Sequence, residues 1–142
     1  MVMWILIANQ DASFRLALRM FLQAQKDIIV VAEVTRTGDL LRDAFSFQPD
    51  LIFLDWNLPN IERFTVSGHQ NKSTGTPSPN QVKAVLIASL HCIQSMPVII
   101  VTGNHQEDIL PVLYSGADEF FCAGEMPTRL MTILASVHSK HD

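Results

Sequence analysis

This chain of 142 residues lacks the sequence signatures of disulfide scaffolds, membrane spans and nucleic-acid-binding tracts. Its two cysteines, Cys92 and Cys122, are too few for a disulfide framework and are typical of a reducing compartment. No apolar run approaches the roughly 18 residues that a membrane helix needs. Acidic residues outnumber basic ones, 14 against 10, and no basic tract occurs, so we expect no binding to DNA or RNA.

The apolar stretch at the amino terminus lacks the features of a secretion signal. No basic segment precedes residues 1–8, and the polar residues Asn9, Gln10 and Asp11 follow directly. The length fits one domain, since most single domains have about 100–150 residues. We therefore expect one soluble, cytoplasmic domain over residues 1–142, with neither a membrane nor a nucleic acid as partner.

Signatures of catalysis and of cofactor binding are missing as well. The chain contains no Walker loop, no G-x-G-x-x-G fingerprint and no G-x-S-x-G elbow. Its histidines and cysteines do not have the spacing of a zinc site. We therefore expect no enzyme activity, no catalytic residue and no resident cofactor.

Short apolar runs alternate with amphipathic stretches along the chain. Most runs are continuous, which is typical of strands covered on both faces. The predicted strands are residues 3–8, 28–34, 51–54, 97–101 and 119–122. Apolar residues at helical spacing predict helices around residues 14–22, 40–45, 82–93, 109–113 and 130–137. The alternation predicts an α/β fold, a doubly wound parallel sheet of five strands with helices on both faces.

Particular residues mark the predicted ends of the helices. Asp11 is expected to cap the first helix, and Asn104 with Glu107 to open the fourth. Gly116 is expected to follow the fourth helix, and Pro127 to lie in the first turn of the last.

One segment fits neither a strand nor a helix. Residues 61–80 are rich in Ser, Thr, Gly, Pro and Asn and show no periodicity. We interpret them as an inserted flexible loop, and loops of this length in compact domains are often functional.

Polar residues follow several of the predicted strands. In an open parallel sheet, ligands bind beyond the carboxyl ends of the strands, where the strand order reverses. Asn9 and Gln10 follow the first predicted strand, and Thr102 follows the fourth. Asp55 is the most conspicuous of these residues, because an acid directly follows the apolar run 51–54. The sequence therefore predicts a site around Asp55.

The residues around this site resemble those of response-regulator receiver domains. Residues 49–59, which contain Asp55, are similar to the phosphoacceptor segment of that family. The similarity also covers residues 5–11, 96–102 and 116–120. It implies a flavodoxin-like fold and a phosphoacceptor role for Asp55. It also implies that Thr102 is the hydroxyl that follows the phosphoryl group, and that Phe120 is the switch aromatic.

The chain departs from the family pattern at the positions that carry charge. Receiver domains normally have two acids after the first strand, which bind magnesium together with the phosphoacceptor, and here Asn9 and Gln10 stand in their place. The lysine that normally follows the fifth strand is replaced by Ala123. Magnesium prefers carboxylate oxygens, and phosphoryl transfer depends on charge stabilisation. We therefore expect weak magnesium binding at Asp55, no other cofactor, and weak or absent phosphorylation.

Three neighbours of Asp55 receive their own interpretations. The side-chain amides of Asn9 and Gln10 are expected to donate hydrogen bonds to Asp55 and so to lock the domain in one conformation. Trp56 is interpreted as a lid on the site rather than as a ligand-stacking group.

The function that these residues favour is that of a receiver-like signalling domain in a two-component phosphorelay, acting by protein–protein interaction. We expect the partner to be a histidine kinase or a separate effector, unless the chain is one domain of a longer protein. One alternative is a genuine magnesium-dependent phosphoacceptor. A second is a small-molecule-binding, flavodoxin-like sensor or enzyme that uses the strand ends and the 61–80 loop.

The first predicted helix carries a candidate partner surface. Leu16 and Met20 lie one turn apart on the side away from the predicted core, beside Arg15 and Arg19. Two stacked apolar residues on a basic face are typical of a contact with a partner helix. The surface of the fourth and fifth predicted helices, which the family often uses, is the competing candidate.

Overall fold

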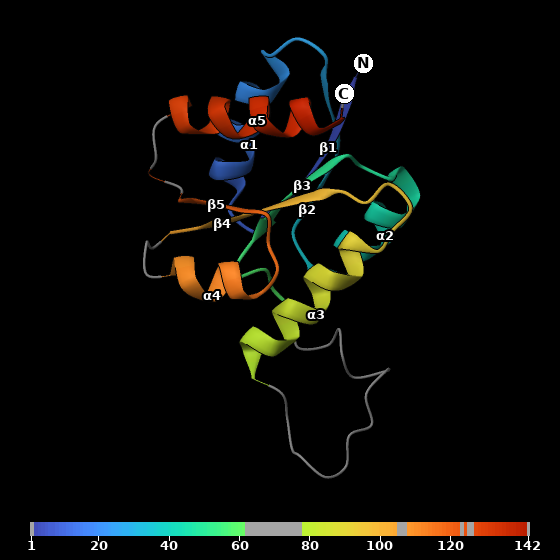
Figure 1. The fold of residues 1–142 in the computed structure, drawn as a ribbon, viewed down its shortest axis with the longest axis vertical. Coiled ribbons are helices and arrows are strands. Elements are labelled where there is room, and N and C mark those ends of the chain that lie inside the picture. Colours follow the sequence, from blue (N-terminus) through green and yellow to red (C-terminus); the bar gives the residue numbers. More distant parts are fainter. Residues whose placement is uncertain (1, 62–77, 105–107, 123, 125–126, 142) are drawn as a thin grey trace.

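The computed structural model describes residues 2–61, 78–104, 108–122, 124 and 127–141. They form a central parallel sheet with helices on both faces (Figure 1). The strands are β1 (Met3–Ala8), β2 (Ile28–Val34), β3 (Leu51–Asp55), β4 (Val98–Gly103) and β5 (Glu119–Cys122). The helices are α1 (Ala12–Gln23), α2 (Thr37–Phe47), α3 (Pro79–His91), α4 (Ile109–Tyr114) and α5 (Pro127–His141).

The strand order is β2-β1-β3-β4-β5, and all neighbouring strands are parallel. The chain runs outwards from β1 to β2 and then returns to the other side of β1, so the order reverses between β1 and β3. This is the flavodoxin-like arrangement, in which the reversal opens a crevice at the carboxyl ends of the strands. The predicted fold class is confirmed.

The predicted strands are confirmed, with two corrections at the carboxyl edge. β3 extends by one residue to Asp55, and β4 begins at Val98 and continues through Thr102 and Gly103. The ladder between these strands persists to the pair of Asp55 with Thr102. Both side chains are therefore held by strand backbone rather than by a loop.

The helices cover the sheet as two layers with separate apolar clusters. In Figure 1, α1 and α5 lie on one side of the sheet, and α2, α3 and α4 lie on the other. Leu22 and Leu134 pack with alternate residues of β1 and β3 on the first side. Leu40, Leu86 and Val112 pack with the remaining alternate residues on the second. No helix in the described part of the chain is long and apolar enough to cross a membrane.

Three of the predicted helix boundaries are confirmed and one is wrong. Asp11 caps α1, Pro127 begins α5, and Gly116 follows α4 with a φ of +96°, a conformation that glycine adopts without steric cost. The predicted opening of α4 at Asn104 is wrong, because α4 begins at Ile109 after Asp108. The other member of the predicted pair, Glu107, lies outside the described residues.

The predicted loop 61–80 is shorter at its carboxyl end than the composition suggested. α3 begins at Pro79, so Pro79 and Asn80 are helical. Ser78 and Gln81 form a reciprocal capping box, and proline is well accommodated in the first turn because that turn needs no N–H donor from it. Residues 62–77 of the predicted loop lie outside the described residues.

Candidate functional site

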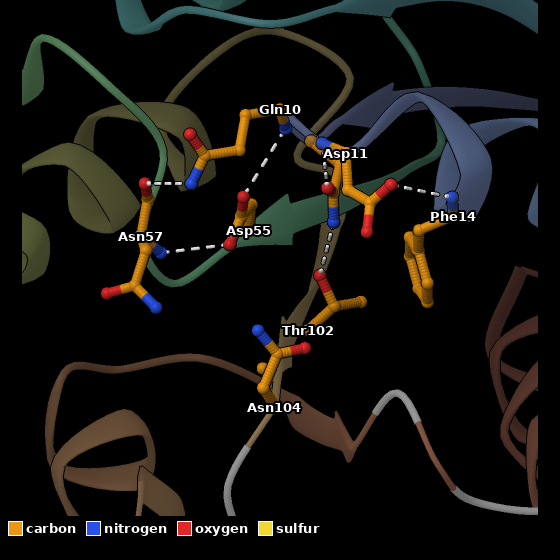
Figure 2. Close-up of a pocket in the computed structure, with 9 residues that line it drawn as sticks. Gln10, Asp11, Phe14, Asp55, Asn57, Thr102 and Asn104 are labelled. Atoms are coloured by element: carbon orange, nitrogen blue, oxygen red, sulfur yellow. Dashed lines mark hydrogen bonds between the residues drawn. The ribbon is translucent and has the colours of Figure 1, made fainter.

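A pocket of about 300 Å³ lies at the carboxyl edge of the sheet, where the strand order reverses. Figure 2 shows side chains from the ends of β1, β3 and β4 converging on it. Its lining consists of Asn9, Gln10, Asp11, Phe14, Asp55, Asn57, Thr102, Gly103 and Asn104. The structure thus brings together the predicted residues Asn9, Gln10, Asp55 and Thr102.

Asp55 accepts hydrogen bonds from two backbone N–H groups. Asn57 N lies 2.9 Å from Oδ1, and Gln10 N lies 3.4 Å from Oδ2. Burial raises the pKa of the Asp55 carboxyl above its ordinary value, and the charge of Asp11 acts in the same direction. The two N–H groups and the ammonium of Lys83 lower this pKa, but burial outweighs them.

Asn9 is buried and links two strands and a helix. Its Nδ2 donates to Thr102 Oγ1 at 3.3 Å, and its Oδ1 accepts from Asp11 N at 2.8 Å. Its backbone carbonyl accepts from Arg15 Nη1 at 2.8 Å. Both ends of the Asn9 amide therefore have partners other than Asp55.

Gln10 directs its side chain at the loop after β3. Its Nε2 donates to the backbone carbonyl of Asn57 at 3.2 Å (Figure 2). The predicted donation from the Asn9 and Gln10 side chains to Asp55 is therefore wrong. A hydrogen-bonded network does connect β1 with β3, but Asp55 receives the backbone N–H of Gln10 because the chain turns there into α1.

The residues that line the pocket fit a magnesium ion poorly, because only two of them, Asp55 and Asp11, are carboxylates. Magnesium requires oxygen ligands in near-octahedral geometry, usually including carboxylates. Here Asn9 Oδ1 accepts a backbone N–H, and the Asn57 carbonyl accepts the Gln10 amide. Among the described residues, no group of three or more His, Cys, Asp or Glu side chains could hold a metal ion.

Asp11 contributes a carboxylate to the rim of the pocket while it caps α1. Its Oδ1 accepts from Ser13 N at 2.9 Å and from Phe14 N at 3.3 Å. The predicted capping role is confirmed, and it satisfies two N–H groups that the first helical turn leaves without partners.

Thr102 and Phe120 lie on the β4–β5 side of the pocket. Thr102 is buried and bonded to Asn9, while the buried ring of Phe120 packs against the end of β4. A Cβ atom at Gly103 would lie 2.9 Å from Phe120 Cε1, so the ring occupies the space that a side chain would need. Of the predicted site residues, Ala123 lies outside the described residues.

The interpretation of Trp56 as a lid is wrong. Trp56 does not line the pocket, and its side chain is 5% exposed within the apolar cluster on the α2–α3–α4 side. Its backbone N–H donates to Thr102 O at 2.9 Å, so the backbone at Trp56 is held against β4 while the ring packs in the core. Lys83 of α3 stacks on this ring, with Nζ 4.1 Å from the ring centroid. Sequence reasoning missed Lys83, although the S-x-x-Q pattern at residues 78–81 indicates the helix start that positions it.

The predicted partner residues of α1 are exposed, Leu16 by 47% and Met20 by 63%. The neighbouring arginines are paired with β2: Arg15 and Arg19 both approach Glu33, Arg19 at 2.9 Å. This pairing partly neutralises the basic face that the sequence predicted.

Helix α4 exposes more apolar surface than the sequence suggested. Leu110 and Leu113 are both exposed, and Tyr114 is 86% exposed. The helix has only six residues, so its small buried stripe, centred on Val112, leaves these large side chains outside.

Comparison with known protein-family models gives no match. The curated relatives are the nitrate/nitrite response regulator NarL of two Escherichia coli strains, K12 and O6:H1. Each is 25% identical over 131 residues, which are 92% of this chain and 52% of the relative. The chain therefore spans about half the length of the curated relatives it matches.

Solved structures of receiver domains have the same fold. The receiver domain of the response regulator AraT from Geobacillus stearothermophilus has a TM-score of 0.73 at 21% identity, covering 99% of this chain and 95% of that one. A two-component response regulator of the LuxR family from Aurantimonas sp. SI85-9A1 has a TM-score of 0.71 at 18% identity, covering 98% and 87%. The chain thus has the fold of response-regulator receiver domains, and 92% of it is similar in sequence to part of NarL.

Proposed function

We propose that this receiver domain signals by protein–protein interaction, without enzyme activity, and that phosphorylation of Asp55 is weak or absent. The observation that carries the proposal is the double role of Gln10. Its side-chain amide donates to the Asn57 carbonyl, and its backbone N–H donates to Asp55. One residue thus supplies N–H donors to two oxygens that a cation would otherwise need as ligands.

The charge balance of the pocket supports weak phosphorylation. Phosphoryl transfer to a carboxylate brings two anionic groups together, so catalysis depends on positioning and on cations that stabilise the transferring group. The amides of Asn9 and Gln10 provide hydrogen bonds but no negative charge with which to hold such a cation. Asp11 adds a negative charge close enough to raise the pKa of Asp55. The pocket therefore favours the unmodified carboxyl.

Partner binding requires a surface, and two described surfaces are candidates. Leu16 and Met20 of α1 form one, and the exposed side chains of α4 form the other. We propose a histidine kinase or an effector as the partner, acting in the cytoplasm. Because the curated relatives are about twice as long, the effector is either a further segment of the same protein or a separate one.

Acetyl phosphate with magnesium, followed by intact-mass measurement, tests the proposal. The wild-type chain is expected to form little or no phosphoryl adduct. The N9D/Q10D variant restores two carboxylates beside Asp55 and is expected to form a magnesium-dependent adduct, which D55N in the same background abolishes. N104D is the matched control, because it adds an acid to the same pocket from the β4 side and is expected to behave as the wild type. A stable magnesium-dependent adduct on wild-type Asp55 would establish the alternative, a genuine phosphoacceptor.

Thermal unfolding of the same variants tests the hydrogen-bonded network. Without metal, N9D/Q10D is expected to lower the Tm by several degrees, because it removes the Asn9–Thr102 and Gln10–Asn57 bonds and crowds acids around Asp55. Magnesium is expected to restore part of the loss by binding the folded state. An unchanged or higher Tm without metal would show that the network does not stabilise the domain.

A further inference from the structure

A lysine side chain lies beside the Asp55 pocket without lining it. Lys83 places its Nζ 4.1 Å from the centroid of the Trp56 ring. The position of the ring is fixed, because Trp56 directly follows Asp55 at the end of β3 and its side chain is buried in the core. A cation above the face of an indole is attracted by the ring's negative electrostatic face.

Helix α3 anchors this lysine close to its amino terminus. The capping box of Ser78 and Gln81 satisfies the first N–H groups of the helix. Val82 and Leu86, which flank Lys83 along the helix, are buried against the sheet. Lys83 therefore extends from an anchored helical turn, with its stem half-buried and its ammonium over Trp56.

Two carboxylates act on the Lys83 ammonium. Burial lowers the pKa of Lys83, and the charges of Asp108 and Asp55 oppose that change. Asp108 directly precedes α4, and its Oδ2 lies 3.5 Å from the position that a Cβ at Gly103 would take. Lys83 thus lies within electrostatic reach of the pocket carboxylate and of the residue that begins the turn into α4.

We infer that Lys83 is the positioning cation of this pocket and couples the charge on Asp55 to Trp56 and to the start of α4. When Asp55 loses its negative charge, the ammonium is drawn further towards Asp108, and when Asp55 gains charge it is drawn back. The coupling reaches α4, whose exposed apolar side chains are one of the two candidate partner surfaces. The inference rests on the proposed function only in taking Asp55 as the residue whose charge changes.

A set of paired variants followed by ¹H–¹⁵N NMR tests the coupling. The probes are the indole N–H of Trp56 and the backbone N–H groups of residues 109–114, excluding proline. D55N is expected to shift these resonances in the wild-type background. The shift caused by D55N is expected to be lost in K83M and retained in K83R. K26M is the matched control, because Lys26 is an exposed lysine between α1 and β2, and the D55N shift is expected to persist in it.

Two results would overturn the inference. If D55N shifts the Trp56 and α4 resonances equally with and without Lys83, the lysine does not carry the coupling. If K83R also loses the shift, the packing of the lysine stem rather than its charge is responsible. Methionine is a good helix former, so K83M is expected to fold, and circular dichroism checks this directly. The experiment uses neither a phosphodonor nor a metal. The coupling can therefore prove absent while the proposed function holds, and it can prove present while the proposed function fails.

Discussion

At the amino ends of the strands, Asp50 and Asp118 each form two hydrogen bonds with the backbone of one residue in a neighbouring strand, an arrangement that we call a bracket. At the carboxyl ends, Asp55 instead accepts hydrogen bonds from the backbone of two connecting segments. Asp50 N donates to Trp4 O and Asp50 Oδ2 accepts from Trp4 N, both at 2.8 Å. Asp118 N donates to Ile99 O at 2.9 Å, and Asp118 Oδ2 accepts from Ile99 N at 2.8 Å. The same two-bond bracket thus joins β1 to the start of β3 and β4 to the start of β5.

The difference between the two edges separates two structural aspartates from the one for which we propose a function. The bracket of Asp118 is partly buried, and the same Oδ2 also contacts His91 Nε2 at 2.8 Å, which ties the end of α3 to the sheet. Asp55 makes exposed hydrogen bonds to Gln10 and Asn57, and its charge is disfavoured by burial. A carboxylate kept where the fold opposes its charge is typical of a functional position.

The largest expected effect is the difference in unfolding free energy between alanine substitutions at the two edges, D118A and D55A. D118A removes the acceptor of the partly buried Ile99 N–H and the partner of His91, so it is expected to lower the free energy of unfolding by about 1–3 kcal/mol. D55A leaves two N–H groups that water can reach and removes an unfavourable charge, so it is expected to be neutral or stabilising. Denaturant unfolding at neutral pH measures both.

D50A and H91Q resolve this effect into its parts. D50A removes only the side-chain bond of the equivalent bracket, the acceptor of the Trp4 N–H, at a more exposed position, and it is expected to cost less than D118A. H91Q removes only the contact with Asp118, an exposed pair worth at most about 1 kcal/mol. If D55A costs as much as D118A, the comparison fails and Asp55 is a structural residue too.

A smaller effect is expected on the closely packed side of the carboxyl edge. The Cβ introduced by G103A would lie 2.9 Å from Phe120 Cε1 and 3.1 Å from Cζ, so the buried ring must shift. We expect a loss of about 1 kcal/mol, at the lower end of the range for overpacking, because one methyl group is added. G38A is the matched control, since a Cβ there meets nothing within 4 Å, and it is expected to gain up to about 1 kcal/mol from helix propensity. Equal changes in Tm for the two variants would show that the Phe120 ring is not tightly held.

The sequence predicted the fold well because the strands are continuous apolar runs with polar ends. Three strands begin and end at the predicted residues, and the gathering of Asp55, Thr102 and Asn9 follows from parallel topology alone. In a parallel sheet all carboxyl ends lie at one edge, so residue types at strand ends predict which side chains meet.

The directions of the side chains could not be predicted in the same way. Whether the Gln10 amide reaches Asp55 or the Asn57 carbonyl depends on its torsion angles and on the course of the loop after β3. The burial of Trp56 depends on how α2, α3 and α4 pack against the sheet, and the contact with Lys83 joins segments separated by residues 62–77. These contacts depend on tertiary structure, and local pattern carries little information about them.

The pH dependence of stability is the smallest effect and the most direct test of the carboxyl edge. Because burial raises the pKa of Asp55 in the folded state, folding favours the protonated carboxyl over the charged one. The folded state then binds more protons than the unfolded state as pH rises from the ordinary pKa of 3.8 towards the raised value, so the free energy of unfolding falls across that interval. Above the raised pKa the contribution of Asp55 is constant and unfavourable.

D55N removes this titration while leaving the other acids in place. The difference in unfolding free energy, wild type minus D55N, is expected to decrease as the pH rises above about 4 and then to level off. Taking a difference cancels the titration of the groups that both proteins share. NMR titration of the Asp55 carboxyl locates the same transition independently. A difference that increases with pH would mean that the fold favours the charged carboxylate, and Asp55 would then resemble the aspartates of the amino edge.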